Sequence, residues 1–176
     1  AVRWFASQGQ FEAARPVASG PVLNALLAIN NQWPLEVDGN RTVDWLEIYS
    51  GAVAEKSLAG WKLRLADADA QSGEPEREYA FPADAKIASG GLLLLVFSNN
   101  VRSPYHTGFK IPGGGGTFTL VDAAGSVADR LVYPAQRENL SYSRYRDGVP
   151  SFAVNNFPRP GRSPPDNGAL PPILLL

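Results

Sequence analysis

The stretch Asp44-Trp45-Leu46-Glu47-Ile48-Tyr49-Ser50 decides the fold that we expect. In an extended chain successive side chains face opposite ways, so Leu46 and Ile48 share one face while Trp45, Glu47 and Tyr49 share the other. The aliphatic pair is suited to a core, and two amphipathic aromatics around an acid are suited to a partly covered sheet surface. The stretch therefore predicts a scaffold strand with Leu46 and Ile48 packed inward.

The composition limits the classes of protein that fit. With 176 residues, the chain is long enough for one domain with a sizeable core. Sixteen Lys and Arg against 17 Asp and Glu give a net charge of -1, so the chain as a whole does not attract nucleic acid or anionic membrane. The absence of cysteine excludes disulfides and cysteine zinc sites. The absence of methionine favours a segment of a longer protein over a processed product.

Short apolar or alternating segments, separated by turn residues, predict the remaining strands. Residues 61–65 alternate, with Trp61, Leu63 and Leu65 inward, as in a half-buried antiparallel strand. Leu92–Phe97 is apolar throughout and is predicted to be the central, most buried strand. It is far shorter than the roughly 20 residues that span a bilayer. Further strands are expected at 22–29, 78–81, 86–87, 117–121, 127–133, 141–145 and 151–154. Without a long amphipathic helix, this pattern predicts an all-β, antiparallel sandwich.

Several motifs follow one another in a fixed order along the chain. They are Val22-Leu23-Asn24, the 44–49 stretch, Leu58-Ala59-Gly60-Trp61, residues 90–97, His106-Thr107-Gly108-Phe109-Lys110-Ile111, residues 115–120, Tyr133-Pro134, Ser141-Tyr142-Ser143-Arg144 and the exit at 158–161. Together they resemble the lamin-tail domain, an immunoglobulin-like β-sandwich. The resemblance implies three parts. Residues 1–20 are an upstream linker or the end of a preceding module, 21–162 are the immunoglobulin-like sandwich, and 163–176 are a proline-rich linker or the start of a following module.

The resemblance also implies a function. The chain has no sustained heptad, so a lamin itself is not expected. The family also occurs in bacterial secreted and envelope proteins, as a module beside hydrolase, nuclease or kinase-like domains. This implies a non-catalytic structural or protein-interaction module of a larger extracellular or cell-envelope protein, whose partner is another protein or a neighbouring domain. The alternative is an accessory domain that binds substrate or DNA for an attached nuclease or other hydrolase. The motif residues that the resemblance marks as structural are Asp44, Trp45, Glu47, Gly60, Trp61, His106, Phe109, Lys110, Tyr142 and Arg144.

The sequence offers little for catalysis or cofactor binding. A Ser-His-acid triad would have to use His106, the only histidine, and no nucleophile-elbow pattern frames any serine. The four glycines 113–116 are followed by strand formers and not by the Lys-Ser or Lys-Thr of a phosphate loop. We therefore expect no catalytic residue, no bound cofactor and no enzyme.

Calcium is the one metal for which the sequence offers candidates. Residues 36–44 place oxygen ligands at alternating positions, with Asp38, Asn40 and Asp44 as candidate ligands. The acidic series is incomplete and Arg41 adds an opposing charge. The competing interpretation is a turn in which Asp38 and Asn40 bind their own backbone. A second acidic group is a less favoured metal-site candidate and is otherwise expected to be a solvated loop; it comprises Asp67, Asp69, Glu74, Glu76 and Glu78.

Two surface interactions remain open from the sequence. Arg130, Arg137, Arg144 and Arg146 could gather near Tyr142 and Tyr145, which would suit a phosphate backbone, but nearby acids dilute the charge, and nucleic acid is not expected. Uncovered sheet edges could pair with a second copy of the chain, because an edge presents free backbone donors and acceptors.

Overall fold

The computed structural model describes residues 17–70 and 75–162, and its regular structure is almost entirely β. The flanking segments 1–16 and 163–176 lie outside the described residues. Within the described ranges, no helix is long and apolar enough to cross a membrane.

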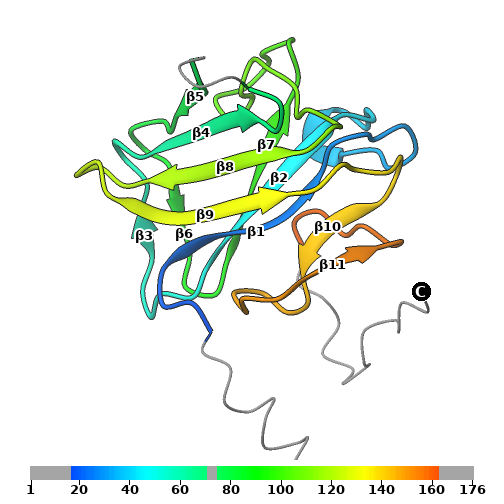
Figure 1. Ribbon diagram of the computed structural model, residues 1–176. Coiled ribbons are helices and arrows are strands. Elements are labelled where there is room, and N and C mark those ends of the chain that lie inside the picture. The colour runs from blue at the N-terminus through cyan, green and yellow to red at the C-terminus, as the bar shows by residue number, and fades with distance from the viewer. Residues whose placement is uncertain (1–16, 71–74, 163–176) are drawn as a thin grey trace, which may run out of the picture.

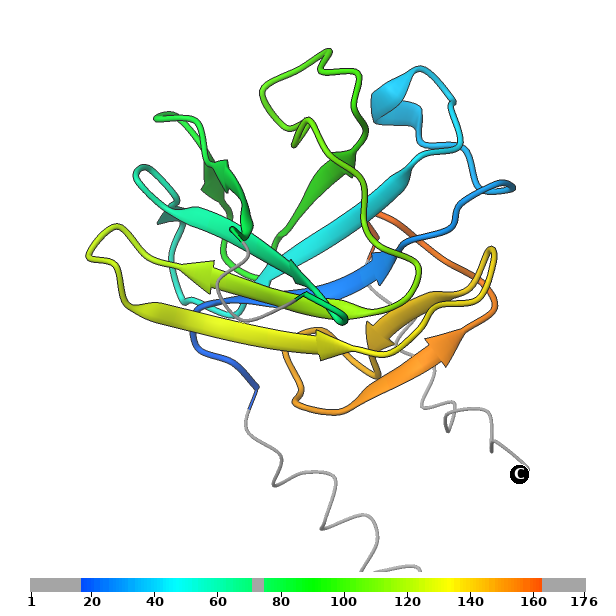
Figure 2. The same ribbon diagram turned by 45° about the horizontal axis from the view of Figure 1, so that its top comes forward.

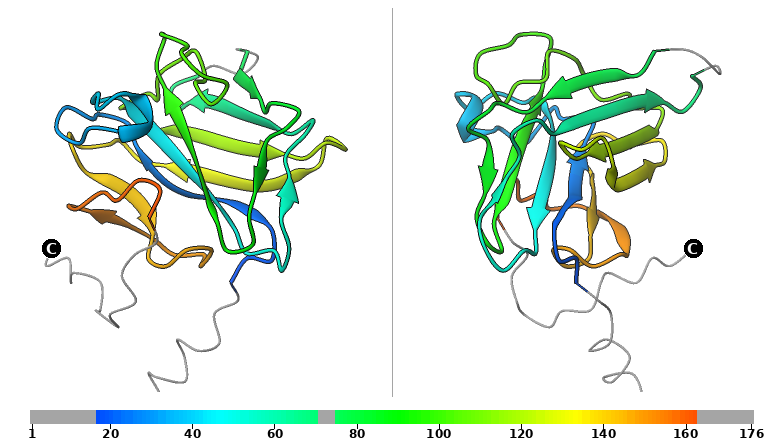
Figure 3. Two further views of the ribbon diagram at one scale, coloured as in Figure 1. Left: turned by 180° about the vertical axis from the view of Figure 1, so that it is seen from behind. Right: turned by 90° about the vertical axis from the view of Figure 1, so that its left-hand side faces the viewer.

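Two antiparallel sheets face each other (Figures 1 and 3). The five-stranded sheet has the order β11-β10-β1-β2-β7, and the four-stranded sheet has the order β5-β4-β8-β9. The chain thus forms an all-β antiparallel sandwich, in which β1, β2 and β7 face β4, β8 and β9 (Figure 1). The predicted fold class is therefore confirmed.

The element bounds agree with the sequence prediction to within a few residues. The five-stranded sheet contains β1 (Pro21–Leu27), β2 (Asp44–Ser50), β7 (Leu92–Phe97), β10 (Ser141–Arg144) and β11 (Phe152–Asn155). The four-stranded sheet contains β4 (Lys62–Asp67), β5 (Arg77–Ala80), β8 (Gly116–Val121) and β9 (Val127–Tyr133). A short pair joins β3 (Lys56–Ser57), which the sequence pattern did not predict, to β6 (Lys86–Ile87), and one 3-10 turn, η1, covers Glu36–Asp38.

The core lies between the inner faces of the two sheets. Leu46 and Ile48 of β2 are fully buried there, as predicted, against Leu63 of β4 and Phe118 of β8. Trp61 also enters this core. The expected inward faces of β2 and β4 are therefore confirmed.

The outer face of β2 differs from the prediction. Trp45 is only 1% exposed and Glu47 only 3%, so this face is buried at both positions, while Tyr49 is half-buried. Trp45 packs in a second cluster with Leu35 and Val96, against which Trp33 of the 28–43 loop also packs. The loop thus covers one end of the five-stranded sheet, which a strand pattern does not reveal.

The prediction that Leu92–Phe97 is the most buried strand is wrong. The first half of β7, up to Leu94, is only half-buried, whereas β2 is buried along most of its length. The reason is position, because β7 is an outer strand of its sheet and β2 lies between β1 and β7. The second half of β7 is covered by the 98–107 loop, where Val96 N–H donates to Tyr105 O (2.9 Å) and Thr107 N–H donates to Val96 O (3.0 Å).

Candidate functional site

A bulge in β1 organises the polar groups of the domain. The pairing register between β1 and β2 shifts between Leu23 and Ala25, which leaves Asn24 as the extra residue. The buried Asn24 amide donates to Glu47 Oε1 (2.9 Å) and to Asp147 Oδ1 (2.8 Å), and its oxygen accepts from Gly148 N–H (3.2 Å). Both donors and the acceptor of this amide are therefore used inside the protein.

Glu47 connects the same cluster to the outgoing segment 156–162. Its Oε2 accepts a hydrogen bond from Gly161 N–H (2.7 Å), and its Oε1 accepts from Asn24. Burial raises the pKa of Glu47 to about 7; the hydrogen bonds from Asn24 and Gly161 oppose this shift, and the charge of Asp147 adds to it. We call Asn24, Glu47, Asp147, Gly148 and Gly161 the Glu47 cluster.

Arg144 holds the opposite side of the bulge. Its Nε donates to Leu23 O (2.8 Å), its Nη1 to Val149 O (2.6 Å) and its Nη2 to Asp129 Oδ2 (3.0 Å). The same Asp129 oxygen accepts from Leu23 N–H (2.8 Å). The guanidinium also lies over the Phe152 ring, 4.7 Å from its centroid. Arg144 therefore joins β1 to β9 and to the loop that follows β10.

The incoming segment 17–20 lies against the same region. Ala18 N–H donates to Gly148 O (3.0 Å), and Gly51 N–H donates to Gly20 O (3.3 Å). A Cβ on Gly51 would collide with the Ala18 carbonyl, so the close passage of this segment requires glycine. The first and last described parts of the chain are thus both fixed to the β1–β2 region.

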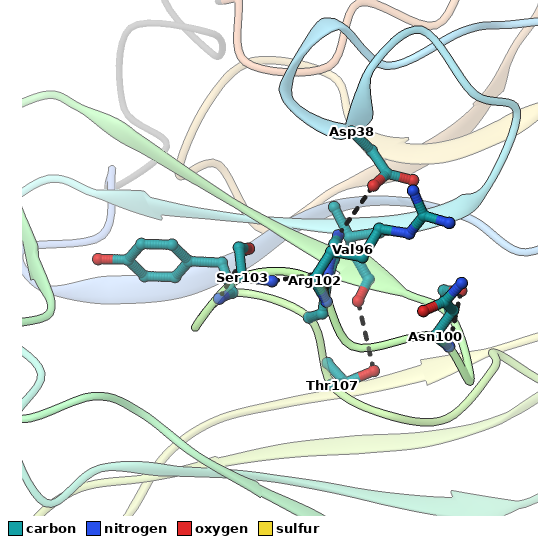
Figure 4. Close-up of polar contacts among 9 residues, drawn as sticks. Asp38, Val96, Asn100, Arg102, Ser103 and Thr107 are labelled. Carbon is teal, nitrogen blue, oxygen red and sulfur yellow. Dashed lines mark hydrogen bonds and ion pairs between the residues drawn. The ribbon is translucent and has the colours of Figure 1, made fainter.

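A second buried polar contact lies under η1 (Figure 4). His106 Nδ1 accepts the N–H groups of Arg102 (2.6 Å) and Ser103 (3.0 Å), which assigns the ring proton to Nε2. Nε2 lies 3.2 Å from Asp38 Oδ1, without the alignment of a regular hydrogen bond. The imidazole and the carboxylate are almost completely buried. Because both ring nitrogens face protein groups, the arrangement ties the 98–110 loop to η1 and leaves no nitrogen directed at solvent.

The three calcium candidates contact different partners. Asp38 faces His106, and Asn40 is exposed in the left-handed region (φ 59°). Asp44 accepts backbone hydrogen bonds from Asn30 and Ile111, while burial raises its pKa to about 6. In residues 17–70 and 75–162, no three His, Asp or Glu side chains are grouped as metal ligands. Calcium binding stays a prediction without an assembled site.

The η1 turn also differs in detail from the competing interpretation. Backbone hydrogen bonds close it, from the N–H groups of Asp38 (3.1 Å) and Asn40 (2.9 Å) to Leu35 O. The Asp38 carboxylate instead faces His106, because the loop covers the sheet and buries this side chain.

The remaining motif residues have packing or backbone roles. Gly60 has a left-handed φ of 76° in the turn before β4. Phe109 packs edge-on against Phe97, with 5.5 Å between ring centroids, and Tyr142 stacks on Phe152 at 5.2 Å. The Lys110 carbonyl accepts from Arg77 Nη1 (3.2 Å), and its side chain is exposed.

The arginine patch considered from the sequence is not assembled. Arg144 is bound to Asp129 on the inside of the bulge, whereas Arg130 is exposed on β9 and Arg137 is exposed in the loop before β10. These positions divide the positive charge between the interior and separate surface elements.

Sequence reasoning missed several members of the buried clusters. Asn24 belongs to the Val22-Leu23-Asn24 motif, but no role is predicted for it; its position as a single polar residue in the apolar segment 22–29 is the available signal. Asp129 and Asp147 had no local signal, and the exit motif that contains Gly161 does not identify its partner, because Asp147 is 123 residues from Asn24 and Gly161 is 114 residues from Glu47.

Comparison with known proteins does not identify the chain. No protein-family model matches it, and no curated protein matches it. The likeness to the lamin-tail domain therefore rests on the ordered motifs.

Proposed function

We propose that residues 21–162 form a non-catalytic structural or protein-interaction module of lamin-tail type, within a larger extracellular or cell-envelope protein of a bacterium. The observation that carries the proposal is that the polar motif residues bind other parts of the same chain. Asn24, Glu47, Arg144 and His106 are directed into the protein, where they join strands and fix the incoming and outgoing segments.

A catalytic role would require something different of these groups. A general acid or base must come within hydrogen-bond reach of its substrate, either directly or through one water. Glu47 has an elevated pKa, which is common at active sites, but structural networks also shift pKa values. Its carboxylate oxygens accept hydrogen bonds from Asn24 of β1 and Gly161 of the outgoing segment. Burial between these two segments therefore explains the raised pKa.

Substitution separates the two roles. Arg144→Ala removes three hydrogen bonds and leaves Asp129 without its cation, so we expect a loss of about 3 kcal/mol in the free energy of unfolding. Residues selected for chemistry often cost stability, so their replacement commonly leaves stability unchanged or increases it. Chemical denaturation measures the difference. The matched control is Arg130→Ala, at an exposed arginine without an ion pair in the described residues, and it should change stability by less than about 0.5 kcal/mol.

An unchanged or increased stability of Arg144→Ala would contradict the proposal. The accessory DNA-binding alternative has its own signature, an affinity for DNA that falls steeply as salt rises. Detection of such binding at low salt would replace the interaction module with that alternative.

A further inference from the structure

The outgoing segment returns from the end of β11 to the outer face of β2 (Figure 2). Pro158 is buried, and residues 159–162 then form a turn closed by one backbone hydrogen bond (3.1 Å), which we call the exit turn. In the described part of the chain, the hydrogen bond that joins the exit turn to the sandwich runs from Gly161 N–H to Glu47 Oε2 (2.7 Å). Pro160 has no N–H with which to add another. The polar attachment of the exit turn therefore depends on the Glu47 carboxyl.

Glu47 is enclosed without a cation beside it. It is 3% exposed and forms no ion pair within residues 17–70 and 75–162. The neighbouring strands β1 and β7 contain no charged residue, Arg144 of β10 binds on the other side of the bulge, and the side chains of Arg159 and Arg162 in the exit turn are exposed. The charge that acts on Glu47 is that of Asp147, which has the same sign. Ionisation of Glu47 is therefore opposed as long as the carboxyl stays enclosed.

Release of the exit turn would change this balance. It would remove Gly161 N–H, one of the two donors to the carboxyl, and admit water, which favours the charged form. With the turn attached, burial raises the pKa of Glu47 to about 7; with the turn released, the pKa moves toward the ordinary value of 4.5. The released state therefore holds the proton less tightly. Attachment is strongest at low pH, and it weakens as the pH rises until the weakening is complete above about pH 7.

We propose that the exit turn is a pH-dependent latch, bound to β2 while Glu47 is protonated and released when Glu47 ionises. Opening beyond Pro158 changes the direction in which the chain leaves the sandwich, while the incoming segment keeps its own bond from Ala18 to Gly148. This inference rests on the proposed module function, because the direction of the exit matters only where the sandwich is connected to other parts of a larger protein.

The test follows the Gly161 amide by NMR in the isotope-labelled full chain between pH 5 and 8. Two quantities are measured, the proton shift and the solvent exchange corrected for the intrinsic rate. We expect the protection of Gly161 to fall about tenfold or more over this range, and its proton to move upfield as the hydrogen bond is lost. Ionisation without release has the opposite signature, because a charged acceptor strengthens the bond and moves the proton downfield. Amides of the β2–β7 ladder report global unfolding and should stay protected.

Three variants identify the titrating group. Glu47→Gln cannot ionise and should make the Gly161 signals independent of pH. Asp147→Asn removes the like charge and keeps an oxygen for Asn24, so the transition should move to lower pH; this variant also tests the latch if Glu47→Gln does not fold. Glu36→Gln is the matched control, because it removes an exposed carboxylate in η1 and should keep the wild-type transition.

Three outcomes would overturn the proposal. The first is a protection of Gly161 that stays constant from pH 5 to 8, and the second is an equally strong transition in Glu47→Gln. The third is a loss of protection that the β2–β7 amides share, because the whole domain then unfolds and no local latch opens. The stability loss expected for Arg144→Ala does not involve ionisation of Glu47, so failure of the latch is distinguishable from failure of the proposed module function.

Discussion

Glu47 predicts that the domain loses stability as the pH rises from 5 to 8. Its pKa is raised from the ordinary value of 4.5 to about 7, chiefly by burial. Between these values the folded protein holds a proton that the unfolded chain releases, so unfolding becomes more favourable with increasing pH. A difference of about 2.5 pKa units corresponds to a loss of roughly 3 kcal/mol in the free energy of unfolding. This loss is complete above pH 7. Asp44, with a pKa raised to about 6, acts in the same direction.

The assay is urea unfolding of the wild type and Glu47→Gln at several pH values between 5 and 8. We expect the substitution to remove most of the dependence on pH. A glutamine amide must direct its NH2 group at a donor, either Asn24 or Gly161, which lowers stability by about 1–3 kcal/mol at every pH. The readout is therefore the slope of the unfolding free energy against pH and not its absolute value. The control is Glu36→Gln, which removes an exposed carboxylate in η1 and should keep the wild-type slope. Wild-type stability that is constant or rises from pH 5 to 8, or a slope in Glu47→Gln as steep as that of the wild type, would refute the reasoning; a smaller slope from Asp44 is expected to remain.

Three further outcomes are expected. Leu46→Ala should cost about 2–5 kcal/mol in denaturant unfolding, because Leu46 is fully buried in the core; a cost below about 1 kcal/mol would mean that the inward face is misassigned. Gly51→Ala should displace the incoming segment, because the new Cβ would meet the Ala18 carbonyl, and faster amide exchange at Ala18 would report this; unchanged exchange would contradict the close passage. Calcium and a chelator should leave the melting temperature unchanged, since Asp38 and Asp44 are held by different partners; a calcium-dependent increase would show that the 36–44 loop rearranges into a site.

The strands were predictable because their information is local. Alternation in 61–65 and the β2 stretch gave the strands and their inward faces, and turn residues marked most boundaries. The outer face of β2 was not predictable in this way. Trp45 and Glu47 are compatible with a surface as much as with an interior, and their burial depends on the 28–43 loop and the outgoing segment. Which loop covers which face is a property of the tertiary arrangement.

The ordered motifs contained more site information than the search for catalytic patterns. Glu47, His106 and Arg144 were identified through the resemblance, and the structure places each in a buried polar contact. The carboxylates that these residues contact, other than Glu47 itself, lie outside the motifs and could not be found in the same way. Asp129 and Asp147 are among the acids near the candidate arginine patch, and nothing in the neighbouring sequence distinguishes a carboxylate in an internal contact from a solvated one.

The bulge at Asn24 explains why these polar contacts occur together. A bulge removes regular ladder partners, and here Asp129 and Arg144 replace them at the N–H and C=O groups of Leu23. Moving the pairing of β1 by one residue would exchange the faces of its side chains and would leave the groups that bind Asn24 and Leu23 buried without partners. Apolar contacts alone would tolerate such a shift more readily, since they are not directional. The polar clusters therefore select one register of β1, and through Gly148 and Gly161 the same selection fixes where the chain enters and leaves the sandwich.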